Sequence, residues 1–342
     1  MCFLVRGAVL AVALAASQPA AALTITPYFD STIIGASNQS SVQTAINDAI
    51  GTIDGLYSNG GTIGIVFTQA NGNFLGQSST TDNFISYNTY KTALTAASVR
   101  EPANTTLASA IAHLSSGNDA NGAKNVAVTT AELKLGLGFS NQSGFFSTNG
   151  SYISSGGQSA YGVITLTDNP GFSLNYGTSA AAGAYSMIDV AEHEINEILG
   201  GGGQGSMLNA VASGTSPFNG LVGALDMFRY SSPGVASFTT SSSATSYFSV
   251  DGGVTSIIGW NQSSGGDFAD FITNTNIQSA FSSSGILATY NSSSPEFAMM
   301  EVLGYNGVVP EPATLAMLAS GLAGLGSVRR RRVRKLQQPR FG

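Results

Sequence analysis

The chain has 342 residues with 43% hydrophobic residues, enough for a sizeable core, but only 9% are charged, far below the roughly 25% of an average domain. Seven of the 13 basic residues lie at Arg329 and beyond, which leaves five basic and 18 acidic residues between Leu23 and Val308. A body this acidic argues against nucleic-acid binding and suits divalent cations and an extracellular setting.

The first 22 residues have the three parts of a secretory signal peptide. Arg6 supplies the positive charge, an apolar stretch follows, and Ala20 to Ala22 form a small-residue cleavage site. We therefore expect export through the Sec pathway and a mature chain that begins near Leu23. Cys2 is the only cysteine and would be lost with this peptide, so the mature protein would have no disulfide and no thiolate ligand.

The first elements of the mature chain predict an α/β layer. Residues 23–34 alternate in the manner of a strand, and residues 62–68 form a short apolar run typical of a buried strand. Between them, residues 41–58 place apolar side chains on one helical face, with Ser41 as the expected N-cap. A strand–helix–strand order favours parallel strands connected by a crossover helix.

The middle of the chain predicts two more helices and another strand. We expect helices over residues 86–97 and 103–114, a Ser/Gly/Asn-rich loop over 141–157 and a strand over 161–167. As an edge strand beside an active-site cleft, this last strand could align an extended peptide. His113 has no acidic or histidine partner within one turn, so we expect an ordinary surface or packing histidine.

Residues 186–200, SMIDVAEHEINEILG, are the stretch around which the chain is organised. Apolar residues recur at helical spacing, and a run of four glycines ends the pattern. His193 and Glu197 are four residues apart and share one helix face, where a ring nitrogen and a carboxylate oxygen can hold one divalent metal. Glu194 points to the side of this pair, where it could reach a metal-bound water.

The alternative for this helix is a surface element with a solvated acidic face. Glu192, Glu194 and Glu197 stand within six residues without a lysine among them. Like charges crowded on one turn are mildly destabilising, which argues against that alternative and favours a metal site.

Candidates for a third metal ligand come from the chain beyond the glycines. Asp226 is the first candidate, because the chain between it and Glu197 is long enough to loop back and its apolar neighbours indicate burial. A buried carboxylate needs a counter-charge, and Arg229 could serve instead of a metal. Asp267 and Gln204 are weaker candidates.

The C-terminal part of the mature chain is irregular and rich in glycine and serine. Asp251, Asp267 and Asp270 stand among glycines, and turn chemistry explains them. Calcium binding is the alternative for these aspartates, although their spacing fits no EF-hand loop. Residues 295–303 predict a last helix that ends at Gly304.

Residues 309–342 form a tail in three parts. Val309 to Pro312 read Val-Pro-Glu-Pro, an apolar run over 313–328 follows, and four arginines over 329–332 come next. In their order, spacing and terminal position, these three parts resemble the PEP-CTERM sorting signal. An ordinary tail anchor is the alternative, but it does not explain the Val-Pro-Glu-Pro. The resemblance implies a protein held in the inner membrane until an exosortase-type transpeptidase removes the tail, and then placed at the cell surface or outside the cell.

The central motif HEINEILG, residues 193–200, is similar to the first eight positions of the metzincin peptidase signature, H-E-x-x-H-x-x-G-x-x-H. Together with LDMFRYSSPG, FSVDGG, GGDFADF and MMEVLGY, it resembles bacterial metalloproteases that often carry PEP-CTERM tails and share H-E-I-x-E-x-[LM]-G. That resemblance covers the mature chain to Tyr305. Glu197 stands where the second histidine would be, and Gly203, which cannot bind metal, stands where the third would be.

The resemblance implies an α/β (α+β) fold of the metzincin-like zinc-peptidase kind over residues 23–308, with a mixed twisted sheet and an active-site helix. It implies a protein or peptide substrate and zinc held by His193, Glu197 and Asp226, although an oxygen-rich site could prefer a harder ion such as calcium. Glu194 would be the general base, and Tyr230 would stabilise the oxyanion. The competing hypothesis is a non-catalytic surface or matrix protein on a degenerate peptidase fold.

Overall fold

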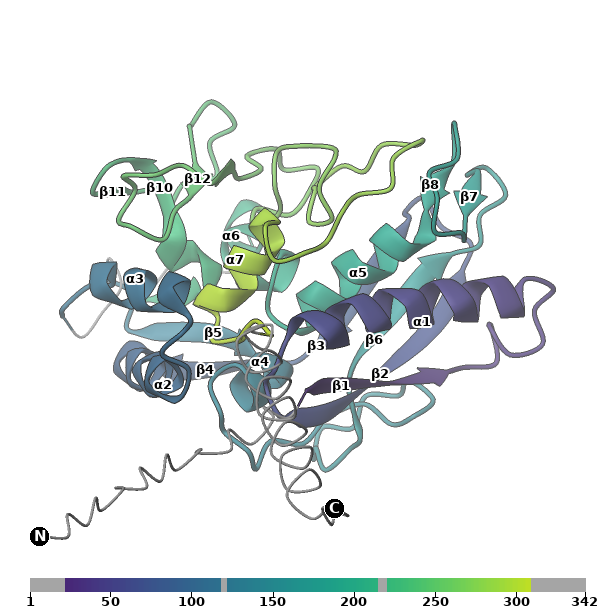
Figure 1. Ribbon diagram of the computed structural model, residues 1–342, viewed down its shortest axis with the longest axis horizontal. Helices are drawn as coiled ribbons and strands as arrows, with labels where there is room; N and C mark the ends of the chain where they lie inside the picture. The colour runs from purple at the N-terminus through teal and green to yellow at the C-terminus, as the bar shows by residue number, and fades with distance from the viewer. Residues whose placement is uncertain (1–21, 118–121, 215–219, 309–342) are drawn as a thin grey trace, which may run out of the picture. The chain divides into compact units, whose positions relative to one another are not determined.

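The computed structural model describes residues 22–117, 122–214 and 220–308, and its contacts divide the chain into two compact units, Met1–Gly307 and Val308–Gly342. A four-stranded sheet in the order β1-β2-β6-β3 underlies the first unit (Figure 1). Neighbouring strands are parallel from β1 to β6, and β3 pairs antiparallel with β6 as an edge strand. The strands are β1 (Leu23–Phe29), β2 (Gly61–Ala70), β3 (Gly76–Thr80) and β6 (Ala160–Thr167).

Two helices lie side by side over this sheet (Figure 1). Helix α1 (Gln39–Leu56) connects β1 to β2, and helix α5 (Met187–Ile198) packs against α1, β3 and β6. The apolar stripe of α1, which includes Val42, Ile46 and Ile53, is fully buried in this layer. Each such side chain stabilises the fold by about 1.5–3 kcal/mol through its removal from water. Helix α5 packs against α1 in the same layer and therefore lies beside the edge strand β3.

A second, three-stranded sheet is formed by strands that alternate along the chain with those of the first sheet. Its order is β4-β5-β9, with β4 antiparallel and β9 parallel to the central strand. Helices α2 and α3 contact each other, and the side chains of Ser86 and Asn104 cap their first turns. The elements are β4 (Asp82–Ser86), α2 (Tyr87–Arg100), α3 (Thr105–His113), β5 (Asn125–Thr129), α4 (Thr130–Leu135) and β9 (Leu221–Gly223).

From residue 174 to residue 308, apart from α5, the described chain consists of short strands, short helices and long loops, and its last element is the helix α7. Four strands form a sheet in the order β11-β10-β12-β13, and β7 pairs with β8 ahead of α5. The strands are β7 (Leu174–Asn175), β8 (Tyr185–Ser186), β10 (Arg229–Ser232), β11 (Val235–Ala236), β12 (Tyr247–Phe248) and β13 (Ile258–Gly259). The helical elements are η1 (Gly203–Gly205), α6 (Leu208–Ala212), η2 (Leu225–Phe228) and α7 (Pro295–Val302).

This mixed α/β arrangement confirms the predicted α/β class, and the metzincin-like fold stays a prediction. The predicted strands at residues 23–34, 62–68 and 161–167 are present as β1, β2 and β6. The predicted helices correspond to α1, α2, α3, α5 and α7, and the C-terminal third is as irregular as its composition indicates.

Two predictions about these elements are wrong. Ser41 is not the N-cap of α1, which begins at Gln39 because the chain already turns over the preceding residues and Gln39 Oε1 accepts from the Gly35 N–H. Strand β6 is not an edge strand, because β2 and β3 flank it. The edge beside α5 belongs to β3, a polar segment that the sequence pattern did not predict as a strand.

Within the described ranges, no helix is long and apolar enough to cross a membrane. The predicted signal peptide and the apolar run of the tail both lie outside those ranges.

Candidate metal centre

Helix α5 places its chemistry in a buried setting. Ser186 Oγ caps its first turn by accepting from the Asp189 N–H at 3.2 Å, and Gly200, with φ of 99°, adopts the left-handed conformation that ends the helix. Glu192, Glu194 and Glu197 are only 3–5% exposed. The alternative of a solvated acidic face is therefore wrong.

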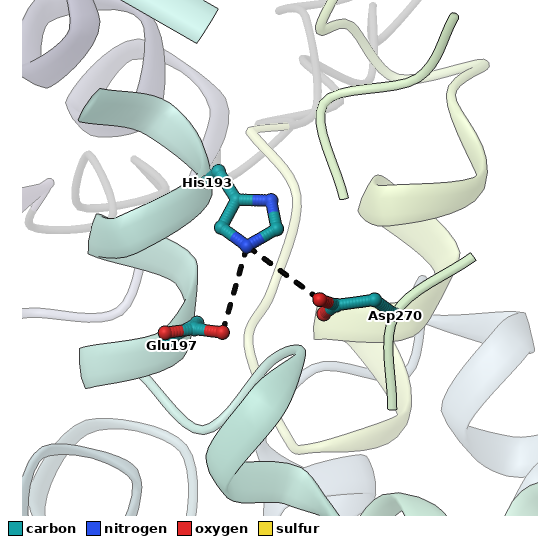
Figure 2. Close-up of side chains that lie close together, drawn as sticks. All are labelled: His193, Glu197 and Asp270. Carbon is teal, nitrogen blue, oxygen red and sulfur yellow. Dashed lines mark ion pairs between the residues drawn. The ribbon is translucent and has the colours of Figure 1, made fainter. Parts of the chain in front are cut away.

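Three side chains converge at the C-terminal half of α5, as Figure 2 shows. His193 Nε2 lies 3.5 Å from Glu197 Oε1 and 3.7 Å from Asp270 Oδ2. One ligand atom from each of the three residues lies within 4.8 Å of the others. Asp270 reaches this point from the loop that follows β13, far along the chain from the helix.

The imidazole of His193 is oriented by a backbone group. Its Nδ1 lies 2.9 Å from the carbonyl oxygen of Ile277, and a carbonyl only accepts, so Nδ1 carries a proton and donates. Nε2 therefore faces the two carboxylates. A hydrogen bond at the second ring nitrogen is the usual means of fixing the tautomer of a metal-binding histidine.

Glu197 is held from two sides. Ser78 Oγ, on the edge strand β3, donates to Glu197 Oε2 at 2.7 Å, and the Gly203 N–H donates to Oε1 at 3.1 Å. The backbone approaches closely here because Gly203 has no side chain, and a Cβ at that position would lie 2.4 Å from Glu197 Oε1. Gly203 thus helps to position the Glu197 carboxylate.

Glu194 lies beside this group with an unused oxygen. Its Oε2 is buried and has no hydrogen-bond partner, although buried polar atoms are normally paired. Gly76 of β3 lies against Glu194, where a Cβ would be 2.5 Å from Oε1. The carboxylate is thus confined between α5 and β3, close to Glu197.

The charges of the cluster are tightly linked. Burial opposes the charged form of His193, but Asp270 and Glu197 outweigh it and raise the pKa of His193 well above its ordinary value. Burial raises the pKa of Asp270 to about 8, and burial together with Glu197 raises that of Glu194 well above its ordinary value. Burial acts in the same direction on Glu197, but hydrogen bonds from His193 and Ser78 prevail and lower its pKa.

The group opens into a cleft of about 780 Å³. Strand β3 and the residues before it line one side, α5 contributes His193, Glu194 and Glu197, and the loops around Asp267 and Phe281 line the other side. None of the described residues that line the cleft is a lysine or an arginine. The lining includes the carboxyl groups of Glu194, Glu197, Asp267 and Asp270, groups that can bind a cation.

Asp226, the predicted third ligand, is placed elsewhere by the structure. It is fully buried, and its oxygens accept from Ser206 Oγ at 2.5 Å, from the Met207 N–H at 2.9 Å and from the Gly223 N–H at 2.8 Å. Burial raises the pKa of Asp226, and the charge of buried Arg229 and these hydrogen bonds oppose that rise. This carboxylate organises the turn at η2, and Asp270 takes the position beside His193 instead.

Tyr230, the predicted oxyanion partner, does not line the cleft. It lies in β10 opposite Ala236 and Tyr247, close to Gly253. Burial and the charge of Asp251 raise its pKa.

Of the other residues considered as ligands, two line the cleft and two lie outside it. Gln204 and Asp267 line the cleft, Asp267 Oδ1 accepts from Asn209 Nδ2, and burial together with Glu197 raises the pKa of Asp267 to about 6. Asp251 accepts from the Thr255 N–H and completes a turn, as predicted. His113 is exposed and bonds within its own helix, so it is a surface histidine, as predicted.

Asp270 is the residue that the sequence interpretation missed. The glycines before it predict a turn, but Phe268, Ala269 and Phe271 are all at most 1% exposed. An acidic residue within a buried apolar run needs a partner, and that pattern was the available signal.

The donor set fits a divalent cation. The 3.5 and 3.7 Å separations exceed the roughly 2.7–2.9 Å of a charge-assisted hydrogen bond. They are close to the roughly 3.4 Å that separates two ligands of one tetrahedral zinc with bonds of about 2.1 Å. Glu194 lines the same cleft.

One comparison with known proteins gives a match. Residues 308–332 match the PEP-CTERM protein-sorting motif, which is recognised by exosortase-type sorting enzymes. No curated protein and no solved structure matches the chain. The predicted sorting signal is confirmed, and it marks the chain for export and membrane-associated sorting.

Proposed function

We propose that this protein is an exported metal-dependent endopeptidase in which His193, Glu197 and Asp270 hold a divalent cation. The observation that carries the proposal is the approach of three ligand atoms, from a helix and a distant loop, at ligand-to-ligand separations inside an acidic cleft. One nitrogen and two carboxylates suit zinc, and the oxygen-rich surroundings also admit a harder ion.

A cation bound there would act as a Lewis acid toward a peptide carbonyl and would lower the pKa of a nearby water. Glu194, which lines the cleft beside these ligands, would supply the base: its carboxylate would accept a proton from the attacking water and return it to the leaving amine. Ser78 and Gly203 hold Glu197 in place, and Ile277 holds the ring of His193.

The edge strand β3 gives this cleft a means of holding a peptide. Residues 73–79 line the cleft, and β3 has β6 on only one side. An extended peptide could pair with the free main-chain groups of β3, while Phe74, Phe172 and Tyr185 offer apolar contacts.

The sorting motif completes the proposal. An exosortase-type enzyme would remove the tail at the inner membrane and leave the body at the cell surface or outside the cell.

The competing function is a non-catalytic surface protein with a structural metal. A structural site needs ligands but no base, so Glu194 distinguishes the two. We expect Glu194→Gln to keep one metal per chain and to lose casein hydrolysis by about 100-fold or more. Glu101→Gln, outside the cleft, is the matched control and should keep full activity. An unmodified protein that binds metal but cleaves no peptide would favour the structural function.

A further inference from the structure

Gln278 is a buried amide immediately behind the candidate metal centre. Its side chain is completely buried, and its Nε2 donates to Asp270 Oδ1 at 2.9 Å. The same nitrogen also lies 3.3 Å from His193 Nε2. One amide group thus contacts both residues that meet across the gap between α5 and the loop carrying Asp270.

A chain of buried hydrogen bonds fixes the orientation of this amide. A carboxylate that binds a cation only accepts, so the amide nitrogen must face Asp270 and its oxygen must face Asn196, whose Nδ2 lies 3.3 Å away. Asn196 Oδ1 in turn accepts from the Tyr290 hydroxyl at 3.0 Å. Tyr290 is bonded to the Tyr57 hydroxyl at 2.9 Å. Every member is buried and has a partner, the condition under which a polar network specifies one geometry.

The backbone on either side of the Gln278 peptide also contacts His193 and anchors this segment. The preceding carbonyl, of Ile277, accepts from the His193 ring, and the Gln278 N–H donates to Glu296 Oε1 at 3.0 Å, which anchors the segment to α7. Gly202, with φ of 82°, leaves the space that the amide fills, since a Cβ there would lie 2.0 Å from Gln278 Nε2.

We propose that Gln278 is the positioning residue of the metal centre, and that Asn196 acts through it. Its amide holds the Asp270 carboxylate with Oδ2 turned toward His193, so that the loop ligand is in place before a cation arrives. This role rests on the proposed metal site. It predicts that removing the amide weakens metal binding without removing a ligand, because lost outer partners of metal ligands typically cost about 10- to 100-fold in affinity.

The test is a cobalt titration of the purified exported protein, followed by visible absorption, with zinc competition for affinity. We expect Gln278→Met, which preserves length and burial, to bind one cobalt per chain with affinity reduced about 10- to 100-fold and an altered ligand-field spectrum. In Gln278→Asn the side chain is too short to reach both Asn196 and Asp270, so we expect the same loss of affinity. This variant replaces Gln278→Met in the test if the Met variant does not fold.

Gln262→Met is the matched control, since Gln262 is also a buried amide but bonds to Arg229 and to backbone carbonyls. It should lower the thermal midpoint and leave cobalt affinity and spectrum unchanged. In Asn196→Leu/Gln278→Met, the loss should be no larger than in Gln278→Met alone, because both act through one path. Full affinity and an unchanged spectrum in both Gln278 variants would overturn the positioning role alone. Absence of cobalt and zinc binding by the unmodified protein would overturn the metal site and this role together.

Discussion

Asp226 and Asp270 show how two buried aspartates with similar apolar neighbours acquire different roles. Asp226 accepts from three donors and has the charge of Arg229 nearby, so its oxygens are satisfied by the protein itself. Asp270 accepts from Gln278 through Oδ1 and turns Oδ2 toward His193. The number of protein donors that reach each carboxylate therefore distinguishes a structural aspartate from a candidate ligand.

This difference predicts opposite outcomes for two matched substitutions. Asp226→Asn should lower the free energy of unfolding by about 1–3 kcal/mol, because an amide nitrogen would face backbone N–H donors inside the protein. Its metal affinity should stay unchanged. Asp270→Asn should instead lose stoichiometric metal binding with a smaller loss of stability. Urea unfolding of the metal-free proteins measures stability, and zinc titration measures metal affinity. An Asp226→Asn variant that no longer binds zinc would contradict the assignment.

Metal binding should release protons and weaken as the pH falls. In the metal-free cluster the pKa of His193 is raised well above its ordinary value and that of Asp270 is about 8, so both hold protons near neutral pH. A cation must displace those protons, and lowering the pH strengthens their competition. Calorimetry in buffers of different ionisation enthalpy should reveal the release at pH 7. A binding enthalpy independent of the buffer would contradict this picture.

At the scale of elements, the junction between α5 and η1 supports the metal centre. The Gly203 N–H donates to Glu197, and a Cβ at Gly203 would lie 2.4 Å from Glu197 Oε1 and 3.1 Å from Asp267 Oδ2. The absence of a side chain at this position therefore leaves room for the Glu197 carboxylate of the candidate metal centre.

Gly203→Ala should weaken metal binding about 10-fold or more, because the added methyl displaces the Glu197 carboxylate or the backbone that holds it. Gly51→Ala is the control: it lies exposed in α1 with nothing within 4 Å of a new Cβ, and it should stabilise the fold by about 0.5–1 kcal/mol. Zinc affinity and thermal unfolding of both variants provide the comparison. Unchanged affinity in Gly203→Ala would show that the close approach has no role.

The elements that the sequence predicts well are those whose signal is local. Apolar residues at helical spacing predict helices α1 and α5. In α5 the same spacing places His193 and Glu197 on one helix face. Strands β3 and β4 were missed because they are short and polar, and β3 is ordered by pairing with β6, which lies far along the chain. For Asp270, the apolar neighbours indicate burial and the need for a partner, but they do not identify the partner, because tertiary packing brings this residue to α5.

At the scale of the whole molecule, acidic charge and sorting information occupy different segments. The body holds 18 of the 19 acidic residues, whereas the arginines at 329–332 close the matched sorting motif. We therefore predict that protein recovered from the cell surface or the medium begins near Leu23 and lacks those arginines. Intact mass spectrometry decides this, and a mature form that retains the arginines would contradict removal of the tail.

The central claim is that His193, Glu197 and Asp270 bind one cation, and anomalous X-ray diffraction at the zinc absorption edge tests it most directly. In crystals grown with zinc, we predict one strong peak bonded to His193 Nε2 and to a carboxylate oxygen of Glu197 and Asp270, at about 2.0–2.2 Å. A zinc peak bonded to other residues, or no peak in the cleft at a saturating zinc concentration, would contradict the account.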